Sequence, residues 1–490
     1  MNKNIAVCFV VALIFVIPPI NDIHVGEKFW LDNDACILKN EWNKTYGGKE
    51  DDMGYVVLDT QDGYIIGGRT FSYGAGDSDI WIIKTDKEGN EIWNKTYGGK
   101  DAEYIFDVIS VEDGYIIAGQ TFSYSAGTGD GWLIKIDKEG NEIWNKTYGG
   151  KLDEDARKIL ETNDGYIFVA GCWSFGSPNG NVWLVKVDKE GNEIWNKTYG
   201  GKNHEIGYSI TEDGGKYILG GITRSFGAGG YDIWVIKTDK EGNEIWNKTY
   251  GGKNNEYGGI VKQTDKGYVI MGQTSSFGGG KSDLWLLKVD KEGNEIWNKT
   301  YGYKGDDYCG GFALIDDGII MVGCLNASVP ANKGDLWLLK VDKEGNEIWE
   351  RRIGGSSLDY GVTVKSTDDK GYIIAGLTSS FGAGKNDVWF LRTEEPSLEI
   401  EIYGGIGITV IFRNVGEEEL TNLEWDVVLT DAVFFGKERQ GLISSFMPGD
   451  EYKIKLFVFG VGEGKVKVRI GDISKNEHFW IIGPFVNMNH

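Results

Sequence analysis

One stretch of fourteen residues, DKEGNEIWNKTYGG, recurs along the chain at an almost fixed spacing. It begins at Asp86, Asp137, Asp188 and Asp239, and a fifth copy from Asp290 differs only in its last residue, Tyr303. A period of this length is typical of arrays in which every repeat is one supersecondary unit. The tryptophan of this stretch recurs in steps of 51 residues five times and then of 52, at Trp42, Trp93, Trp144, Trp195, Trp246, Trp297 and Trp349.

Each repeat also holds a second tryptophan and three further apolar runs. In the second repeat we predict four strands, at 103–111, 114–121, 131–137 and 141–149, separated by the turn-forming segments EDG, FSYSAGTGD and DKEG. Four antiparallel strands in a repeat of this length indicate the blade of a β-propeller. The second tryptophan follows the same period, at Trp81, Trp132, Trp183, Trp234, Trp285, Trp337 and Trp389.

The phase of the repeat predicts how the array closes. The chain enters it with a fourth-type strand at Trp42 and leaves it with a third-type strand at Trp389. Residues 40–48 should therefore complete the blade begun at 359–393, which removes the loose edges that an open array would expose. The predicted fold is all-β, with a seven-bladed β-propeller over residues 40–395 that is closed by the N-terminal strand.

The repeats resemble a known family. Residues 264–303, TDKGYVIMGQTSSFGGGKSDLWLLKVDKEGNEIWNKTYGY, are similar to propeller repeats found in exported archaeal and bacterial proteins. The resemblance extends over roughly residues 40–393. It implies an extracellular setting, but it implies no shared reaction and no catalytic residues.

The repeat stops near Pro396, and residues 396–490 form a separate domain by this reading. The stretch SLEIEIYGGIGITVIFRNVGEEELTNLEWDVVLT alternates apolar and polar residues, as half-exposed strands do. About seven such strands in a domain of this size predict an immunoglobulin-like β-sandwich. The segments NVGEEELTNLEW, MPGD and GPFV resemble cell-adhesion-related Ig-like domains, which implies a stalk or adhesion module.

The N-terminus predicts export. An apolar run from Ile5 to Ile17 ends at Pro18 and Pro19 and suits the core of a signal peptide better than a membrane span, which needs about 20 residues. Residues 1–26 are therefore a predicted signal peptide, with retention as a short anchor as the alternative, and 27–39 a linker. We expect a secreted or cell-surface protein that contacts the membrane only through such an anchor.

Charge and motif content exclude several functions. The formal net charge of −23 disfavours nucleic acid, whose phosphates need Lys and Arg. The four histidines are dispersed, and the chain has neither a G-x-S-x-G elbow nor a phosphate-binding loop, so we predict no enzyme. Cys309 and Cys324 flank a predicted hairpin turn and would form either a disulfide or two buried thiols.

One acidic residue stands near the start of every first strand. Innermost strands line the centre of a propeller, so these seven acids would ring its mouth and bind a basic peptide or a hard cation such as Ca²⁺. The alternative is that each carboxylate bonds the backbone within its own blade. The seven are Asp52, Glu103, Glu154, Glu205, Glu256, Asp307 and Asp359.

The segments that join second to third strands vary most between repeats and share a face with these acids. We therefore predict a non-catalytic, exported binding or adhesion protein that holds a protein or glycan ligand at this loop-built face. The alternatives are an exported carbohydrate-active hydrolase or lyase with its site at the acidic mouth, and a structural component of the cell envelope. Of the seven N-x-[ST] sequons, Asn326 lies in a predicted loop and is the predicted glycosylation site.

Overall fold

The computed structural model describes residues 41–326 and 334–488. All regular elements in these ranges are β-strands, which confirms the all-β prediction. The predicted signal segment, 1–26, and linker, 27–39, lie outside the described residues. A search of the described ranges finds no helix with the length and apolar character of a membrane span.

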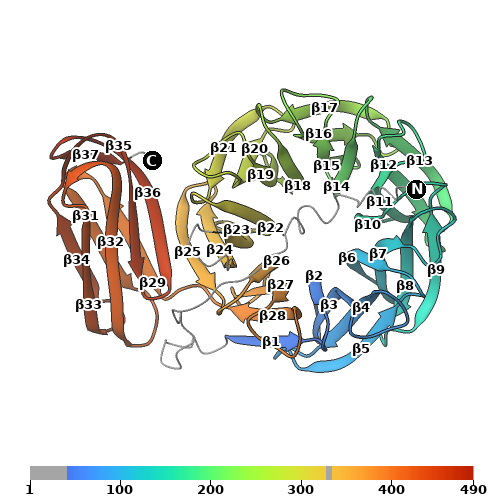
Figure 1. The fold of residues 1–490 in the computed structure, drawn as a ribbon, viewed down its shortest axis with the longest axis horizontal. Helices are drawn as coiled ribbons and strands as arrows, with labels where there is room; N and C mark the ends of the chain where they lie inside the picture. Colours follow the sequence, from blue (N-terminus) through green and yellow to red (C-terminus); the bar gives the residue numbers. More distant parts are fainter. Residues whose placement is uncertain (1–40, 327–333, 489–490) are drawn as a thin grey trace, which may run out of the picture.

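Strands β1–β28 build the repeats. Within the described residues they form six separate four-stranded antiparallel sheets, and four further strands, β22–β25, belong to a larger sheet that continues into the C-terminal domain. Figure 1 shows the sheets side by side in a ring, with the first strand of each repeat innermost and the fourth strand at the rim. Each repeat therefore presents its first strand to the centre and its fourth strand to the outside.

The bounds of these strands follow the period. The first strands are β2 (Asp52–Thr60), β6 (Glu103–Val111), β10 (Lys158–Thr162), β14 (Glu205–Glu212), β18 (Glu256–Thr264), β22 (Asp306–Ile315) and β26 (Asp359–Ser366). The second strands are β3 (Gly63–Thr70), β7 (Gly114–Thr121), β11 (Gly165–Cys172), β15 (Tyr217–Thr223), β19 (Gly267–Thr274), β23 (Gly318–Asn326) and β27 (Tyr372–Thr378). The third strands are β4 (Asp79–Thr85), β8 (Asp130–Asp137), β12 (Asn181–Asp188), β16 (Asp232–Thr238), β20 (Asp283–Val289), β24 (Asp335–Asp342) and β28 (Asp387–Thr393). The fourth strands are β5 (Glu91–Tyr97), β9 (Glu142–Tyr148), β13 (Glu193–Tyr199), β17 (Glu244–Tyr250), β21 (Glu295–Tyr301), β25 (Glu347–Ile353) and β1 (Trp42–Tyr46).

The first strand of the described chain completes the last repeat. Strand β1 pairs antiparallel with β28, from Trp42 opposite Arg392 to Tyr46 opposite Val388. This is the pairing that the phase of the repeat predicts, and it joins residues more than 300 positions apart in sequence. The two ends of the repeat region are thus tied in one four-stranded sheet, ordered β1-β28-β27-β26.

The repeated fourteen residues link each repeat to the next. The ring of Trp93 lies against the turn of the following copy, so that a methyl group added to Gly140 would stand 2.9 Å from it. The Tyr97 hydroxyl donates a 2.6 Å hydrogen bond to the Gly140 carbonyl, and Lys95 Nζ donates to Asn141 Oδ1 at 2.7 Å. Because each copy contacts the next one in this way, the same residues make the same contacts between neighbouring repeats around the array.

The hydrophobic core lies between neighbouring sheets. Second and third strands such as β3, β4 and β7 are buried along their whole length, since both of their faces are covered. One core cluster joins Ile65 and Ile82 of the first repeat to Ile117 and Trp132 of the second. The described cysteines, Cys172, Cys309 and Cys324, are buried free thiols.

The C-terminal domain is a second all-β unit with two sheets. A three-stranded sheet is ordered β29-β31-β34, and the other sheet contains β33, β32, β35, β36, β37 and β30. Their inner faces pack together, with Phe412 of one sheet 6.1 Å from Trp425 of the other, ring centroid to ring centroid. The strands are β29 (Leu398–Tyr403), β30 (Gly405–Ile406), β31 (Ile408–Asn414), β32 (Leu420–Phe435), β33 (Glu438–Phe446), β34 (Glu451–Leu456), β35 (Phe459–Ile470), β36 (Ile473–Gly483) and β37 (Phe485–Met488).

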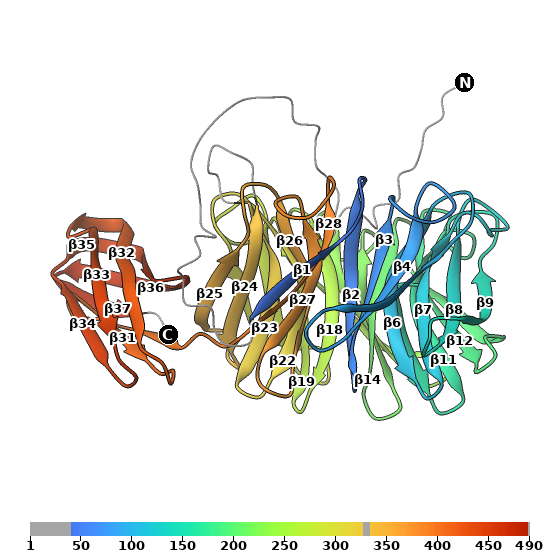
Figure 2. The ribbon, with the colours of Figure 1, turned by 90° about the horizontal axis from the view of Figure 1, so that it is seen from below.

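The C-terminal domain is attached to the rim of the sixth repeat. Strand β36 pairs with the outer strand β25, with Glu350 opposite Ser474 and Arg351 opposite Ile473. Figures 1 and 2 show the domain beside the ring, next to β25. The sixth repeat is therefore the one whose outer edge is covered by the domain.

Candidate functional sites

The seven predicted acids lie at the contacts between consecutive repeats, and Glu154 shows the arrangement. Its backbone N–H donates to the Gly129 carbonyl of the preceding repeat at 2.8 Å. Its Oε2 accepts hydrogen bonds from Gly150 N at 2.7 Å and from Ser174 Oγ at 3.0 Å, and its Oε1 accepts from Ser174 N at 2.6 Å. The carboxylate thus joins the end of one repeat to a loop of the next.

The same arrangement recurs around the array. All seven carboxylates are fully buried, and each accepts a hydrogen bond from a backbone N–H that lies four residues earlier. Among the described residues, no three or more His, Cys, Asp or Glu side chains gather as a metal site. The structure therefore does not bring the seven acids together, and their binding of Ca²⁺ or of a peptide stays a prediction.

Each acid faces a second carboxyl or amide group from the preceding third strand. A methyl group built on Gly149 would lie 2.2 Å from Asp130 Oδ1 and 2.8 Å from Glu154 Oε2, so both oxygens face this glycine. Asp130 is buried, and its Oδ1 has no hydrogen-bond partner. Burial, the backbone contact with Ala126 and the charge of Glu154 together leave the pKa of Asp130 raised, with burial as the main cause.

Six repeats carry this aspartate, and one carries an amide instead. Burial raises the pKa of all six: Asp79, Asp130, Asp232, Asp283, Asp335 and Asp387. For Asp335, burial and the charge of Asp359 raise the pKa to about 6. Asn181 occupies the equivalent position opposite Glu205 and has the shape of a protonated aspartate. These aspartates therefore keep their protons to a higher pH than a free aspartate does.

A group of arginine and aromatic side chains lies near the inner strands and in two of the loops that join second to third strands, 173–180 and 224–231. We call the face that holds these loops the loop-bearing face. Arg157 is 4% exposed, and its guanidinium lies between Phe106, 5.5 Å from the ring centroid, and Tyr208, at 4.7 Å. Asp155 Oδ2 accepts from Arg157 Nε at 2.8 Å. Such a stacked, ion-paired guanidinium is held in a fixed orientation.

Two further arginines extend this group. The Arg69 guanidinium lies 3.7 Å from the ring centroid of Tyr104, and Arg224 lies 5.7 Å from that of Tyr231. Arg224 is exposed to solvent. We call the whole set the arginine–aromatic cluster; it consists of Arg69, Tyr104, Phe106, Arg157, Trp173, His204, Tyr208, Arg224, Tyr231 and Tyr257.

His204 sits in the middle of the aromatic part of this cluster. Its ring centroid is 5.7 Å from Trp173 and 5.7 Å from Tyr231, and its Nδ1 is 3.1 Å from the Tyr231 hydroxyl. Burial, with a smaller contribution from Arg157, lowers the pKa of His204, which favours the neutral imidazole. Tyr257 continues the aromatic surface, 5.5 Å from Tyr231.

Sequence reasoning missed the arginine–aromatic cluster, although one signal was present. Phe106, Arg157 and Tyr208 occupy the same repeat position, three residues after Glu103, Glu154 and Glu205. An arginine between two aromatics at one repeat position places a cation between rings of neighbouring repeats. The stacking itself could be recognised only once the first strands were seen side by side.

The variable loops add exposed aromatic rings. In five repeats the loop between the second and third strands holds a ring that is 41–52% exposed and stands 5.3–5.6 Å from the third-strand tryptophan, centroid to centroid. The tryptophan fixes one side of each ring, and the other side faces solvent. These rings belong to Tyr73, Tyr124, Phe175, Phe226 and Phe277.

The repeated sequon has a structural role. Asn94 Oδ1 accepts from Trp81 Nε1 at 3.0 Å, and Asn94 Nδ2 donates to Glu91 Oε1 at 2.6 Å. The nitrogen that would carry a glycan is therefore already bonded. Asn326, the predicted glycosylation site, is the last residue of β23 rather than part of a loop, and its side chain lies outside the described part of the chain.

The repeat pattern changes where the C-terminal domain attaches. The sixth repeat has Glu350 in place of the repeated asparagine, and Tyr303 stands in place of a glycine. Glu350 Oε2 accepts from Trp337 Nε1 at 2.9 Å, while its Oε1 accepts from Ser474 Oγ at 2.7 Å and Lys467 Nζ at 3.3 Å. Glu350 thus keeps the bond of the repeat and also binds the added domain.

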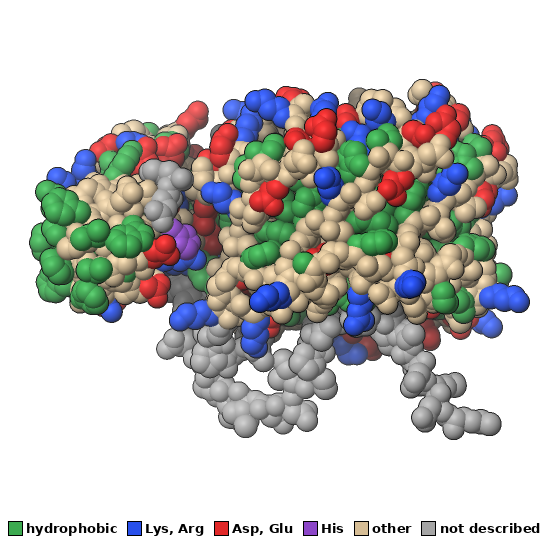
Figure 3. Space-filling view, turned by 90° about the horizontal axis from the view of Figure 1, so that it is seen from above, with side chains coloured by type: hydrophobic (Ala, Val, Ile, Leu, Met, Phe, Trp, Pro, Cys, Tyr) green, Lys and Arg blue, Asp and Glu red, His purple; other side chains and the backbone are tan. Residues whose placement is uncertain are grey.

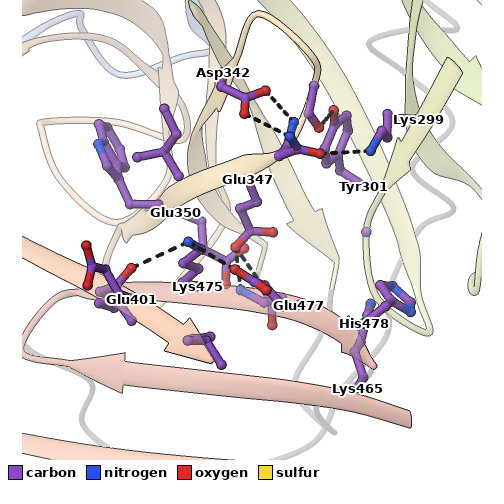
Figure 4. A pocket seen from close by; sticks show the side chains of 18 of the residues that line it. Lys299, Tyr301, Asp342, Glu347, Glu350, Glu401, Lys465, Lys475, Glu477 and His478 are labelled. Carbon is purple, nitrogen blue, oxygen red and sulfur yellow. Dashed lines mark hydrogen bonds and ion pairs between the residues drawn. The ribbon is translucent and has the colours of Figure 1, made fainter. Parts of the chain in front are cut away.

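A pocket of about 550 Å³ lies at this junction, between β21 and β25 on one side and β29, β35 and β36 on the other. Figure 4 shows Glu347 and Glu350 at its wall, with Lys475 and Glu477 of β36 beside them. Glu347 Oε1 accepts from Asn476 N at 2.8 Å and from Asn476 Nδ2 at 3.0 Å. Both carboxyl groups are therefore engaged in attaching the domain.

The two carboxyl groups of the junction differ in their acidity. Burial, followed by the charge of Glu350, raises the pKa of Glu347 to about 8. Burial alone would raise the pKa of Glu350 as well, but Lys467 and Arg352 outweigh it and lower this pKa to about 2. Two carboxyl groups with separated pKa values also occur in acid–base catalysis. Here the contacts with Ser474, Lys467 and Asn476 assign them to domain attachment.

The similarities to known proteins are distant. No family model matches the chain. The chain is similar to the regulatory protein FlaEY of Caulobacter vibrioides, with 22% identity over 382 residues that cover 64% of this chain and 39% of that protein. The chain thus corresponds to about two fifths of the length of this relative.

Solved structures give low similarity scores. The polysaccharide lyase Uly1 matches with a TM-score of 0.44 and 10% identity, covering 71% of this chain and 90% of that chain. The phage phi92 endosialidase matches with a TM-score of 0.42 and 8% identity, covering 73% of this chain and 69% of that chain. Sqt1 from Chaetomium thermophilum matches with a TM-score of 0.42 and 11% identity, covering 76% of this chain and 97% of that chain. Likenesses at this level carry no argument about function.

Proposed function

We propose that this protein is a non-catalytic, exported or cell-surface binding protein that holds an acidic glycan at the loop-bearing face of its repeats. We infer that the seven sets of four strands are the blades of a seven-bladed β-propeller closed by β1, and that residues 396–490 are an Ig-like spacer or adhesion module. The ring in Figure 1 and the pairing of β1 with β28 support the first inference. The two packed sheets of the C-terminal domain support the second.

The exposed Arg224, rather than the buried and ion-paired Arg157, carries the proposal of an acidic ligand. In a chain with a net charge of −23, Arg157 is held between Phe106 and Tyr208, and the exposed Arg224 lies over Tyr231 nearby. Guanidinium groups bind carboxylates in a planar, bidentate manner, and aromatic rings supply flat apolar area with little loss of conformational entropy. An extended polymer that bears both carboxylates and sugar rings fits this combination.

A titration with polygalacturonate tests this function. We expect the wild-type protein to bind it and Arg224→Gln to bind at least about tenfold more weakly, because a charge-assisted contact of about 1.5–3 kcal/mol is lost. Lys240→Gln is the matched control, because Lys240 is a cation in a turn and its side chain is 74% exposed. Equal affinities of the three proteins would show that the cluster does not bind this ligand, and binding of a basic peptide instead would favour the acidic positions.

A second candidate function is an exported carbohydrate-active hydrolase or lyase. The contact of 3.1 Å between His204 Nδ1 and the Tyr231 hydroxyl favours it, because a neutral imidazole beside a phenol can move a proton. Incubation with polygalacturonate, followed by chromatography of the products, separates the two functions. Cleavage that disappears in both His204→Gln and Tyr231→Phe would assign an enzyme, whereas an unchanged polymer supports binding alone.

A further inference from the structure

One end of the C-terminal domain exposes many apolar side chains. Four connections meet there, those between β30 and β31, β32 and β33, β34 and β35, and β36 and β37. Gly407 N donates to the Pro484 carbonyl at 2.8 Å, and the turn at Gly436 lies against Phe457. Figure 3 shows hydrophobic side chains gathered over this domain. Nine of them are 40–74% exposed, and together we call them the apolar face: Ile406, Phe434, Phe435, Phe457, Phe459, Val461, Trp480, Ile482 and Phe485.

Part of the apolar face is a continuous row across one sheet. Val461 of β35 pairs with Ile482 of β36, Ile482 pairs with Phe485 of β37, and Phe485 pairs with Ile406 of β30. Their exposed fractions are 56%, 61%, 62% and 74%. Because directly paired residues point to the same side of a sheet, these side chains form one apolar strip across four strands.

The opposite side of the same strands is also apolar. Ile481 and Val486 alternate with Ile482 and Phe485 and are 0% and 6% exposed, within the core of the domain. Strands that are apolar on both sides are typical of sheets covered by a layer on each side. In the described residues only the inner layer is present, so the outer side of this sheet lacks a covering layer.

We propose that a second copy of this chain covers the apolar face, so that the protein is a two-fold symmetric dimer joined through its C-terminal domains. A two-fold interface uses the same patch on both copies, and it must therefore be self-complementary. This face has the required features. It has a hollow of about 350 Å³ lined by Trp480, Ile482 and Phe485, and it has projecting rings such as Phe434, which is 70% exposed.

The size of the face and its charges agree with such a dimer. Six of the nine side chains are aromatic, and a ring side chain of about 150–250 Å² at these exposures gives on the order of 700 Å² for the six together. With the three aliphatic side chains added, the face reaches the roughly 800 Å² that one partner contributes to a standard interface. The exposed rim residues Lys437, Glu438, Arg439 and Glu463 have both signs of charge. A rim of mixed sign can pair with a copy of itself, whereas a rim of one sign would repel it.

Sedimentation velocity of the purified full chain tests the dimer. At about 10 μM, a standard interface of micromolar affinity or better should leave mainly dimer. Ile482→Glu should weaken self-association at least about tenfold, since it places an unpaired charge in the interface. Leu442→Glu is the matched control on the same domain, because Leu442 is 55% exposed in β33 outside the face, and it should stay a dimer.

A second variant and a second measurement distinguish a second copy of the chain from lipid or another segment as the layer that covers the apolar face. Phe485→Glu changes the same row and should also give a monomer, with the far-ultraviolet circular dichroism spectrum of wild type as the check of folding. A wild-type monomer at this concentration, or a dimer that survives both substitutions, would overturn the proposal. If the wild type is a monomer that floats with neutral phosphatidylcholine vesicles, the face binds lipid. If the wild type is a monomer and Ile482→Glu lowers its melting temperature, the face is covered by residues 1–40 of the same chain.

Discussion

Trp337 Nε1 donates a 2.9 Å hydrogen bond to Glu350 Oε2, whereas in five other repeats the equivalent tryptophan bonds an asparagine Oδ1 at 3.0–3.2 Å. The change from amide to carboxylate keeps this bond and adds an anion at the outer edge of β25. That anion binds Lys467 and Ser474 of the C-terminal domain. The position that holds a packing asparagine in five repeats thus holds the attachment point of the domain in the sixth.

Removal of this charge should weaken the attachment. Glu350→Gln keeps an oxygen for Trp337 but removes the charge bound by Lys467, at an expected cost of about 1.5–3 kcal/mol in the free energy of unfolding of the C-terminal domain. Calorimetry of the full chain should show the transition of this domain moving to lower temperature. Glu399→Gln, at an exposed position of the same pocket, should leave the transition in place. Equal shifts in the two variants would refute the attachment role.

The junction should also depend on pH. The folded-state pKa of Glu347 is raised from its ordinary value of 4.5 to about 8. The stability from this group is therefore fully present below about pH 4.5 and is lost as the pH rises toward about 8. The pKa of Glu350 is lowered to about 2, so its contribution is constant over this window. Thermal melts between these two pH values should show a decline that Glu347→Gln removes. Parallel curves for wild type and variant would contradict this assignment.

The carboxyl pairs between repeats predict a second pH effect. Burial raises the pKa of Asp130, so the stability it contributes is lost as the pH rises through its folded pKa. Asp130→Asn should therefore raise the melting temperature at about pH 8 more than at about pH 4, where the carboxyl group is near its ordinary pKa of 3.8. Asn181→Asp, the reverse change at the equivalent position, should lower it most at the higher pH. The account fails if both variants melt like wild type throughout this range.

The contact between consecutive repeated segments predicts a steric effect. Gly140 has a φ of +79° and its added methyl group would lie 2.9 Å from Trp93, so Gly140→Ala should cost about 1–3 kcal/mol through crowding. Gly214→Ala is the control, because Gly214 has a φ of +60° but no atom within 4 Å of the added carbon. Urea denaturation should show the larger loss for Gly140→Ala. Losses of the same size would mean that the ring of Trp93 moves aside without cost.

The fold of the repeats could be predicted from sequence because its signals are local and recur. Apolar runs and turns such as DKEG mark the strands of each repeat, and the missing partner of the strand at Trp42 indicates its pairing with β28. The position of Glu154 near the start of a first strand was predictable for the same reason. The direction of its carboxylate was not, since that depends on hydrogen bonds from Gly150 and Ser174.

The junction and the arginine–aromatic cluster could not be predicted from the repeat because both depend on contacts between distant segments. Tyr303 and Glu350 were visible as departures from the pattern, but the pattern does not indicate which repeat faces the C-terminal domain. The stacking of Arg157 likewise depends on Phe106 and Tyr208, which lie one period before it and one period after it in the sequence. Departures from a repeat were thus the sequence signal for both sites.

The most direct test of the proposed function compares two forms of one polymer. Calorimetric titration with polygalacturonate should give saturable binding, and the fully methyl-esterified polymer, which has the same sugar chain without its carboxylates, should bind at least about tenfold more weakly. This result would tie the affinity to the carboxylates of the polymer, as expected for binding to the exposed guanidinium of Arg224. Equal binding of the charged and esterified forms, or binding of neither form, would contradict the account.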